Sequence, residues 1–405
     1  MYEVYIHVPF CLRRCGYCDF NTYTASDLGG GASRDHYAAK AIREMRLVKQ
    51  WQIYHGITEP AASTVFFGGG TPTVLPPSSL GAMLRAVDEL WGLAPGAEVT
   101  TEANPDTVDH DSIAALRDLG FNRISFGMQS AVPRVLKTLD RPHTPANVTQ
   151  GVKAAAQVGL RSSVDLIYGT PGEDMGDWRY SVQTALDLGV DHISAYALTL
   201  EPTTAMGRAV AHGTMPGPDD DDEAAKYALA DAMFTEAGLH WYEISNWARP
   251  GYESRHNLGY WRNVDWAGIG PGAHSHYNGV GHGQDVRSWD IAHPKRWAQA
   301  IDRRDVPWQG SERIDAFEHA EELIMLGVRL REGLDCTRVE RAVARIPGQK
   351  GAKTIEGERG PHADPIDDLA AEGLIEVHGT RIIPTLRGRL LNDALIERLY
   401  EAYGL

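Results

Sequence analysis

The chain carries near its first residue the stretch Tyr5-Ile6-His7-Val8-Pro9-Phe10-Cys11-Leu12-Arg13-Arg14-Cys15-Gly16-Tyr17-Cys18. Three of the 4 cysteines in the 405-residue sequence stand here, in a C-x₃-C-x₂-C pattern that follows an apolar run typical of a strand. Three thiolates supply one ligand fewer than an ordinary cubane cluster or a structural zinc site takes. A [4Fe–4S] cluster bound by Cys11, Cys15 and Cys18 would therefore keep one iron open to an outside ligand.

Two other interpretations of the cysteine pattern stay open, namely a zinc site closed by a histidine such as His7 and free thiols without a ligand. Zinc sites usually pair cysteines at short spacings and close with a second pair, which this sequence lacks. Disulfides are not expected, because the clustered cysteines are few and odd in number in a chain of enzyme size. Cys336 is most simply a small core residue. The spacing favours an iron–sulfur cluster.

The cysteine spacing, with Tyr17 between the second and third cysteines, resembles that of the radical S-adenosylmethionine (SAM) superfamily. The resemblance implies that the open iron chelates the amino and carboxylate groups of SAM. It also implies that an electron from the cluster cleaves the sulfonium to a 5′-deoxyadenosyl radical.

Composition and charge narrow the class of protein. The hydrophobic content of 43% is ordinary for a soluble globular chain, and the net charge of −15 argues against a general binder of nucleic acid or anionic lipid. The first residues lack the basic and apolar regions of a signal peptide. The uncharged stretch 61–84 is broken by glycines and prolines, so no transmembrane segment is expected. We expect a soluble, cytoplasmic protein.

Apolar, β-branched runs alternate with amphipathic stretches along the first 240 residues. The expected strands are 4–8, 64–67, 98–102, 123–127, 162–167 and 192–198. The expected helices are 34–50, 78–91, 109–119, 145–158, 178–188 and 224–237. Six such repeats predict an α/β fold with a partial (β/α)6 TIM-type barrel, and periodicity alone leaves a doubly wound sheet as the alternative. Either fold gathers functional residues at the C-terminal ends of the strands.

The sequence predicts three regions: the barrel at 1–240, an extension at 241–311 and a small domain at 312–405. The extension is rich in Trp, Gly and His, and we expect strands and loops laid against the open side of the barrel. The last region predicts a winged-helix-like domain without a basic stripe, and a mobile loop at 348–362. Its elements are helices at 316–330, 365–371 and 386–401 and strands at 375–376 and 381–384. The acidic run 216–223 is interpreted as a loop that caps the following helix.

Further motifs follow one another along the chain in the same order as in one known subfamily. The glycine run at 68–70 follows a strand directly and lets the backbone approach a ligand, although tight turns use such runs without one. The motifs are 7–11, 68–73, Glu102-Ala103-Asn104-Pro105, Gly127-Met128-Gln129-Ser130, Asp140-Arg141-Pro142-His143, 165–169 and 268–275. Together they resemble the subfamily of anaerobic coproporphyrinogen III oxidases and their haem-chaperone relatives, over nearly the whole chain.

The resemblance implies a set of SAM-binding residues. Tyr5, Gly69 and Glu102 would contact the SAM on the cluster. The neighbouring pocket, where the oxidases hold a second SAM, would be lined by Gly70, Thr71, Gln129, Arg141 and Asp165, and Tyr17 and Thr199 occupy further matching positions. Carboxylates accept from hydroxyls or an ammonium, and arginine clamps a carboxylate. The alternatives are that Glu102 and Asp165 cap helices and that Arg141 forms a surface ion pair.

Two sequence features distinguish the oxidases from the haem chaperones. The oxidases have a further cysteine where this chain has Phe20, and Arg255-His256-Asn257-Leu258-Gly259-Tyr260-Trp261 resembles the His-Asn-x-x-Tyr-Trp motif of the chaperones. The resemblance implies that His256 binds haem; an imidazole is a usual axial ligand, and Tyr260 and Trp261 offer flat contact to a porphyrin. The alternative is that these side chains only pack a loop on the barrel.

Two hypotheses follow. The first is a haem chaperone that passes haem to acceptor apo-proteins and carries a [4Fe–4S] cluster, SAM and an electron donor for the cluster. No catalytic residue is assigned, and whether SAM is cleaved stays open. The second is a radical SAM enzyme that decarboxylates coproporphyrinogen III without oxygen in porphyrin biosynthesis, by abstracting a hydrogen from a propionate side chain.

Overall fold

The fold is that of a computed structural model that describes residues 1–279, 284–348 and 365–405, so nearly all of the loop expected at 348–362 lies outside the described residues. Its centre is a curved sheet of six parallel strands in sequential order. The strands are β1 (Tyr2–Val8), β2 (Ala62–Gly69), β3 (Leu93–Ala103), β4 (Arg123–Gln129), β5 (Arg161–Tyr168) and β6 (His192–Ala197). A doubly wound sheet reverses its strand order at a switch point, so the sequential order excludes that alternative and confirms the partial barrel.

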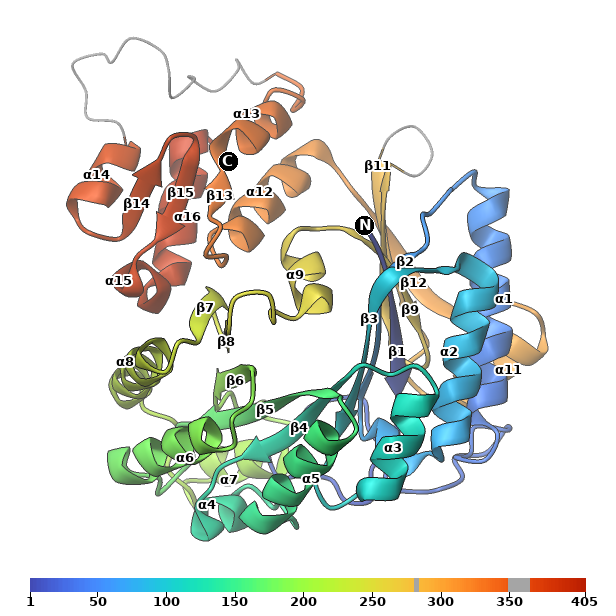
Figure 1. Cartoon of the computed structure of the whole chain (residues 1–405). Helices are drawn as coiled ribbons and strands as arrows, with labels where there is room; N and C mark the ends of the chain where they lie inside the picture. Colours follow the sequence, from blue (N-terminus) through green and yellow to red (C-terminus); the bar gives the residue numbers. More distant parts are fainter. Residues whose placement is uncertain (280–283, 349–364) are drawn as a thin grey trace.

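Helices cover the outer face of this sheet (Figure 1). The long ones are α1 (Tyr37–Tyr54), α2 (Pro77–Trp91), α3 (His110–Asp118), α5 (Pro145–Gln157), α6 (Met175–Asp187) and α8 (Asp220–Glu236). Shorter turns are η1 (Pro72–Val74), α4 (Pro133–Thr138) and α7 (Ala205–Ala211). Polar side chains set the starts of several helices: Asp109, Thr144 and Asp174 each form a capping box. Asp219 caps α8, which confirms the interpretation of the acidic run.

The sheet continues beyond both edges of the barrel and does not close. Beyond β1 follow β9 (Asp265–Ile269), β10 (His274–Gly279), β11 (Gln284–Asp290) and β12 (Trp308–Ile314); beyond β6 follow β8 (Asn246–Ala248) and β7 (His240–Glu243). β9 is parallel to β1, whereas the other added strands pair antiparallel. The region 241–311 thus supplies the expected strands, and its described residues also include helices that the sequence did not predict, α9 (Arg255–Trp261) and α11 (Pro294–Asp302).

The C-terminal part has its own hydrophobic cluster, in which Cys336 is buried as expected. Its elements are α12 (Ala316–Gly327), β13 (Leu334–Asp335), α13 (Cys336–Val343), α14 (Pro365–Ala371), β14 (Ile375–His378), β15 (Arg381–Pro384), α15 (Leu386–Leu390) and α16 (Asn392–Tyr403). The strands form an antiparallel sheet in the order β13-β15-β14, which with the helices makes a winged-helix-like unit. Two expectations were wrong: the helix predicted at 386–401 breaks at Leu391, and α13 was missed.

Helix α9 lies between the barrel and the C-terminal unit (Figure 1). At its end Arg262 pairs with Glu332 at 2.6 Å, and the guanidinium of Arg329 lies 5.6 Å from the Trp261 ring. Arg389 of the C-terminal unit pairs with Asp231 of α8 at 2.9 Å. These contacts join the two parts around α9.

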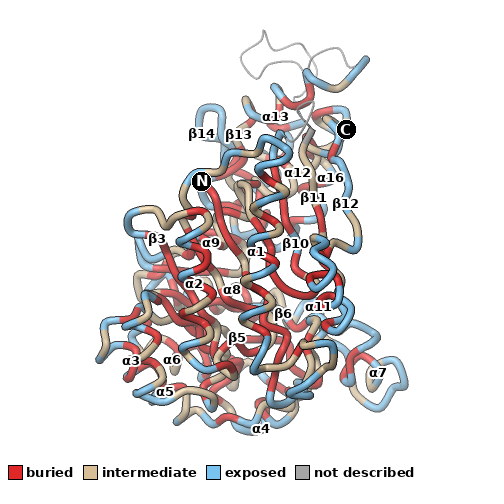
Figure 2. The backbone as a smooth tube through the Cα atoms, turned by 90° about the vertical axis from the view of Figure 1, so that its right-hand side faces the viewer, coloured by how far each residue is buried: buried red, intermediate tan, exposed pale blue. Residues whose placement is uncertain are grey.

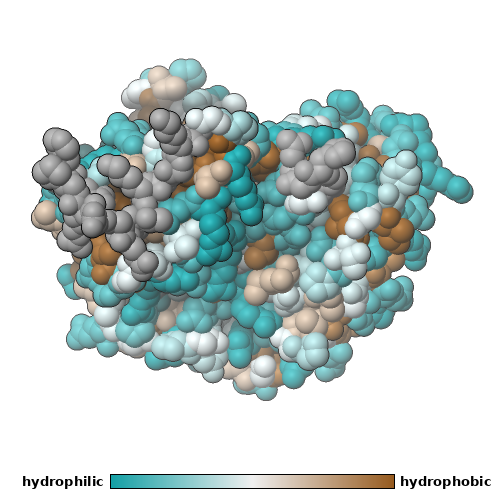
Figure 3. Space-filling view, turned by 90° about the horizontal axis from the view of Figure 1, so that it is seen from above, coloured by the Kyte–Doolittle hydropathy of each residue, from teal (hydrophilic) through white to brown (hydrophobic). Residues whose placement is uncertain are grey.

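Burial follows the strands, and the outer faces of the helices are exposed (Figure 2). Seen from above, the surface is mostly hydrophilic, with hydrophobic residues in small separate patches (Figure 3). Among the described helices, none is both long and apolar enough to cross a lipid bilayer.

Candidate cofactor site

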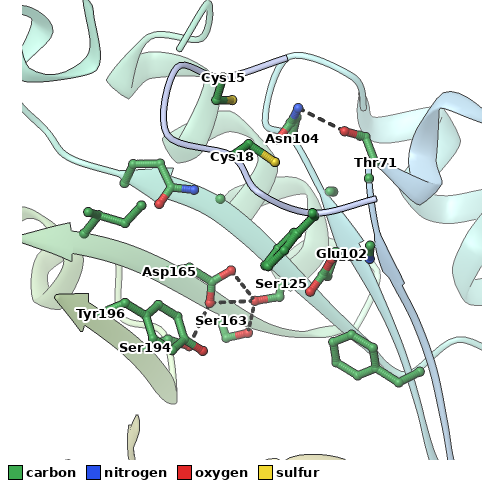
Figure 4. Close-up of a pocket in the computed structure, with 18 of the residues that line it drawn as sticks. Cys15, Cys18, Thr71, Glu102, Asn104, Ser125, Ser163, Asp165, Ser194 and Tyr196 are labelled. Carbon is green, nitrogen blue, oxygen red and sulfur yellow. Dashed lines mark hydrogen bonds between the residues drawn. The ribbon is translucent and has the colours of Figure 1, made fainter. Parts of the chain in front are cut away.

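The three N-terminal cysteines lie on one loop above the carboxyl ends of the strands. The loop is tied to itself where the Cys11 N–H donates to the Tyr23 carbonyl at 2.9 Å and the Tyr23 N–H donates to the Pro9 carbonyl at 2.7 Å. All three cysteines are free thiols and line a single cavity of about 490 Å³. Figure 4 shows Cys15 and Cys18 on this loop, over the strands that carry Glu102 and Asp165.

Each sulfur has a polar neighbour. The Thr71 hydroxyl donates to the Cys11 sulfur at 3.7 Å, Arg141 donates to the Cys15 sulfur at 3.4 Å, and the Thr22 hydroxyl lies 4.0 Å from the Cys18 sulfur. Burial raises the pKa of the Cys11 and Cys18 thiols. Hydrogen bonds to sulfur are a usual means of stabilising cluster thiolates. The donor set and its surroundings therefore fit an iron–sulfur cluster bound by three cysteines.

The zinc alternative fits less well. His7, its proposed fourth ligand, uses both ring nitrogens: Nδ1 lies 3.1 Å from the Tyr5 hydroxyl and Nε2 lies 3.0 Å from the Asn21 carbonyl oxygen. Within residues 1–279, 284–348 and 365–405, no three His, Cys, Asp or Glu side chains converge on a point that would hold one metal ion. A structural zinc site needs four ligands at a single ion.

The glycine run clamps the cysteine loop to β2. Gly69 has a φ of +104°, and a Cβ there would lie 2.5 Å from the His7 ring; a Cβ on Gly70 would lie 2.6 Å from the Phe10 carbonyl oxygen. The Gly70 N–H donates to the Val8 carbonyl and the Thr71 N–H to the Phe10 carbonyl, both at 2.8 Å. The glycines thus border the cavity and hold the loop in place, since any side chain would push it away.

Glu102, at the end of β3, faces into the cavity. One oxygen accepts the Gly69 N–H at 3.2 Å. Burial, together with the nearby Asp165, raises the pKa of Glu102 to about 8. Because its partner is the N–H of Gly69 at the end of β2, the carboxyl does not cap a helix, and burial favours its protonated form up to about pH 8.

Asp165 anchors a polar network across three strands (Figure 4). It accepts from Ser125 at 3.1 Å and from Ser194 at 2.7 Å, and Ser163 donates to Ser125 at 2.8 Å. Burial raises the pKa of Asp165. Sequence reasoning missed these serines, although Ser163 and Asp165 stand two apart on one strand and so share a face. Asp165 is not a helix cap either.

Arg141 lies half-buried in the cavity wall and does not form a surface ion pair. It donates to Asn104 at 2.7 Å and to the Gly127 carbonyl at 3.0 Å, and Asn104 donates to the Thr71 hydroxyl at 3.1 Å. A chain of hydrogen bonds therefore joins the Cys11 sulfur to the Cys15 sulfur. Asn104 was a site residue that sequence reasoning missed, and its place beside Glu102 in the quoted motif was the available signal.

The remaining residues expected at SAM also line this cavity. Gln129 has a left-handed φ of +62° and lines the cavity, as do Tyr5, Tyr17 and Thr199. All ten residues assigned to SAM by resemblance therefore border one cavity with the three cysteines.

Of the three residues expected to contact haem, the structure places two at the cavity and the third away from it. His256 is 2% exposed; its Nδ1 lies 2.6 Å from the Thr64 hydroxyl and its Nε2 lies 2.9 Å from the Tyr260 hydroxyl. Its ring stacks on Phe66 with centroids 5.0 Å apart, and burial lowers its pKa to about 3, so the imidazole is neutral. His256 and Tyr260 border the cavity, whereas Trp261 faces Arg329 of the C-terminal unit and does not line it.

Comparison with known families gives two matches. Residues 5–185 match the model of the radical SAM superfamily, and residues 314–391 match that of the HemN C-terminal domain.

Several proteins named "Heme chaperone HemW" are similar to the chain. The one from Mycobacterium tuberculosis is 44% identical over 98% of this chain and 94% of its own length. The one from Bacillus subtilis is 31% identical over 97% of both. Among solved structures, the radical SAM enzyme coproporphyrinogen III oxidase (HemN) from Escherichia coli covers 99% of this chain and 89% of its own, with a TM-score of 0.77 and 20% identity. That likeness shows a common fold.

Proposed function

The chain belongs to the HemW family within the radical SAM superfamily, and from that premise we propose that it binds haem and passes it to acceptor apo-proteins in the cytoplasm. The observation that carries the proposal is the position of α9. His256 and Tyr260 of that helix border the same cavity as the three cysteines and the ten SAM-matching residues. The helix whose sequence resembles the His-Asn-x-x-Tyr-Trp motif and the cysteine loop, far apart in sequence, thus border one cavity.

We propose that Cys11, Cys15 and Cys18 hold a [4Fe–4S] cluster whose open iron binds SAM. An outside electron donor would reduce this cluster. Once reduced, the cluster would supply one electron for cleavage of the sulfonium of SAM. The chain's own residues would orient the cluster and its ligand. Arg141 and Thr71 donate to cysteine sulfurs, and Glu102 offers a carboxyl to an ammonium or hydroxyl of the ligand. Asp165, held by Ser125 and Ser194, offers a second carboxyl on the neighbouring wall.

His256 has the protonation state that a haem ligand needs. A neutral imidazole binds iron, and burial keeps His256 neutral. Because its Nε2 bonds the Tyr260 hydroxyl, ligation through Nε2 requires Tyr260 to move aside while Thr64 holds Nδ1. Such a partner on the second ring nitrogen is usual for histidines that bind metals.

The test is an anaerobic haem titration of the cluster-reconstituted protein, followed by the Soret band. We expect saturation at one haem per chain and a dissociation constant at least about tenfold higher in His256→Ala. His256→Gln, which keeps a polar group in the core, should show the same loss if the imidazole is the ligand. His240→Ala, a half-buried histidine on the edge strand β7 outside the cavity, is the matched control. Unsaturable binding in all proteins would contradict the proposal, and decarboxylation of coproporphyrinogen III with SAM would then be assayed.

A further inference from the structure

The cavity that holds the three cysteines continues to the opposite end of the barrel. Its walls include Arg123, the first residue of β4, and His192, the first residue of β6. Because the strands are parallel, their first residues lie at the end of the barrel away from the cysteine loop. We call this end the cavity floor, and its polar side chains are those of Arg123, His192, Tyr242 and Asn257.

Arg123 keeps hydrogen-bond donors that no protein acceptor uses. Its side chain is 6% exposed, and its guanidinium makes one long bond within the described residues, to Glu98 at 3.5 Å. Glu98 is already engaged, since its two oxygens accept the N–H groups of Arg255 and His256 at 3.3 and 3.1 Å. A guanidinium carries five N–H donors and is always charged. The floor therefore presents a buried cation with a largely unused donor face.

His192 also has an unused hydrogen-bonding group. It is 5% exposed, and its Nε2 lies 2.8 Å from the Tyr242 hydroxyl, to which Asn257 of α9 donates at 3.3 Å. Its Nδ1 is buried and has no partner in the described part of the chain. Burial and the nearby Arg123 lower the pKa of His192, so the imidazole is neutral. Buried polar atoms without a partner are uncommon in folded proteins, and each calls for a reason.

The cavity floor adjoins the proposed haem ligand. Glu98 bridges the two, because one of its oxygens bonds Arg123 and the other accepts the His256 N–H. His256 rests on Thr64 of β2, whereas Arg123 lies on β4, two strands along the sheet. A porphyrin carries its carboxylates at the edge of the ring and its iron at the centre. An iron ligand and a carboxylate partner for one porphyrin must therefore lie apart on the wall of one cavity, as His256 and Arg123 do.

A second cavity of about 660 Å³ adjoins this one on the other side of His256. Its wall comes from β1, from β9 to β11 and from α12, and the sheet order places β2 between those strands and β4. Tyr260 and Glu102 line both cavities. In the proposed function Tyr260 moves aside when His256 binds iron, and this movement would join the two cavities. A macrocycle on His256 would then have room on the side opposite Arg123.

On the basis of the proposed function, we infer that the cavity floor binds a carboxylate of the porphyrin, with Arg123 as its partner, while the iron binds His256 in the same cavity. A guanidinium binds a carboxylate in a bidentate manner. The neutral His192 and the Tyr242 hydroxyl surround that carboxylate without adding a charge. Arg123 is then the residue that distinguishes a porphyrin acid from a porphyrin without free carboxylates.

Four purified, cluster-reconstituted proteins test this inference: the unmodified chain, Arg123→Gln, Arg123→Lys and the control Arg161→Gln. Arg161 pairs in register with Arg123 on the neighbouring strand β5, but it is exposed and lies outside the cavity. Each protein is titrated anaerobically with haem and with haem dimethyl ester, in which both carboxylates are blocked, and the Soret band is followed. Because SAM also carries a carboxylate, its binding is measured separately by equilibrium dialysis.

We expect the unmodified chain and Arg161→Gln to bind haem at least about tenfold more tightly than its dimethyl ester, because the ester loses a hydrogen-bonded charge pair. Arg123→Gln should bind both with the affinity of the ester, and its Soret band should keep its position because His256 still holds the iron. Arg123→Lys keeps the charge and should retain part of the preference for haem. SAM binding should be equal in all four proteins.

The outcomes separate this inference from the proposed function. An unmodified chain that binds haem and its ester equally would overturn the carboxylate site and leave the haem carrier standing. Equal losses of haem and ester in Arg123→Gln would also overturn it, since Arg123 would then only support α9 through Glu98. A loss of SAM binding with unchanged haem binding would assign the cavity floor to the carboxylate of SAM. Failure of the unmodified chain to bind either porphyrin would contradict the proposed function itself.

Discussion

At the scale of single residues, the site depends on side chains that donate hydrogen bonds to the cysteine sulfurs. The hydrogen bonds from Thr71 and Arg141 reach two different cysteines, and Asn104 joins the two donors. Donors to sulfur stabilise the more negative, reduced state of a cluster and so raise its reduction potential. Thr71 and Arg141 were also assigned to SAM by resemblance, so their hydrogen bonds to sulfur add a second role for each.

Removing the Thr71 hydroxyl should lower the reduction potential of the cluster. A single hydrogen bond is worth about 1 kcal/mol, or about 40 mV for one electron, and Thr71→Val leaves the side-chain volume nearly unchanged. The measurement is an anaerobic redox titration of the reconstituted cluster. Thr73→Val is the control, since the Thr73 hydroxyl bonds Thr107 and no sulfur. A potential that moves equally in both variants would argue against a bond to Cys11.

The raised pKa of Glu102 predicts a dependence of stability on pH. The folded protein holds this proton up to about pH 8, whereas the unfolded chain releases it near pH 4.5. The folded state therefore binds more protons between these values, and its free energy of unfolding falls as pH rises, by at most about 1.4 kcal/mol per pH unit. Glu102→Gln should flatten this decline. Urea unfolding of the cluster-free protein at several pH values between 5 and 9 measures it, and parallel curves for both proteins would contradict the assigned pKa.

At the scale of elements, α9 is held by contacts from strands far away in sequence. Glu98 of β3 accepts the Arg255 N–H at 3.3 Å and the His256 N–H at 3.1 Å. Gly259 lies so close to Glu3 that a Cβ would stand 2.0 Å from a carboxylate oxygen. The orientation of His256 therefore depends on the exact fit of this short helix against β1.

Gly259→Ala should destabilise the protein, although alanine is the better helix former. The gain in propensity is about 1 kcal/mol, whereas forcing a methyl group into a packed contact usually costs about 1–3 kcal/mol. We expect a net loss of stability and weaker haem binding, measured by urea unfolding and by Soret titration. Gly217→Ala is the control, because its Cβ would make only an ordinary contact of 3.4 Å. A more stable Gly259→Ala protein would show that α9 is free to shift.

The sequence predicted the β/α repeats and the short helix α14, but it missed α9 and α13. These two helices have 7 and 8 residues, about two turns each, and so carry little periodic pattern. The cavity was predicted only through motif resemblance. The Asp165 network depends on which strands are neighbours, and the partner of His256, Thr64, is 192 residues away, so neither follows from local spacing.

At the scale of the whole molecule, the barrel, α9 and the C-terminal unit enclose two adjoining cavities. Glu102 and Tyr260 belong to both walls. A ligand in one cavity therefore meets side chains that a ligand in the other also meets. Such contact couples two binding equilibria, and the coupling is reciprocal.

SAM should change the affinity for haem. Coupling between sites is typically about 1–3 kcal/mol, so we expect the dissociation constant of haem to change by about fivefold or more when SAM is saturating. By linkage, haem must change the affinity for SAM by the same factor, which a reverse titration with SAM checks. Identical haem affinities with and without SAM would show that the haem and SAM sites act independently.

The most direct test of a haem chaperone is transfer of its haem. The haem-loaded, cluster-reconstituted protein is mixed anaerobically with a haem-free b-type haemoprotein, and the Soret bands of donor and acceptor are followed. We predict stoichiometric transfer at a rate that rises with acceptor concentration, because haem passes within a complex of the two proteins. Haem that stays on the chain, or that leaves at a rate independent of the acceptor, would contradict a chaperone role.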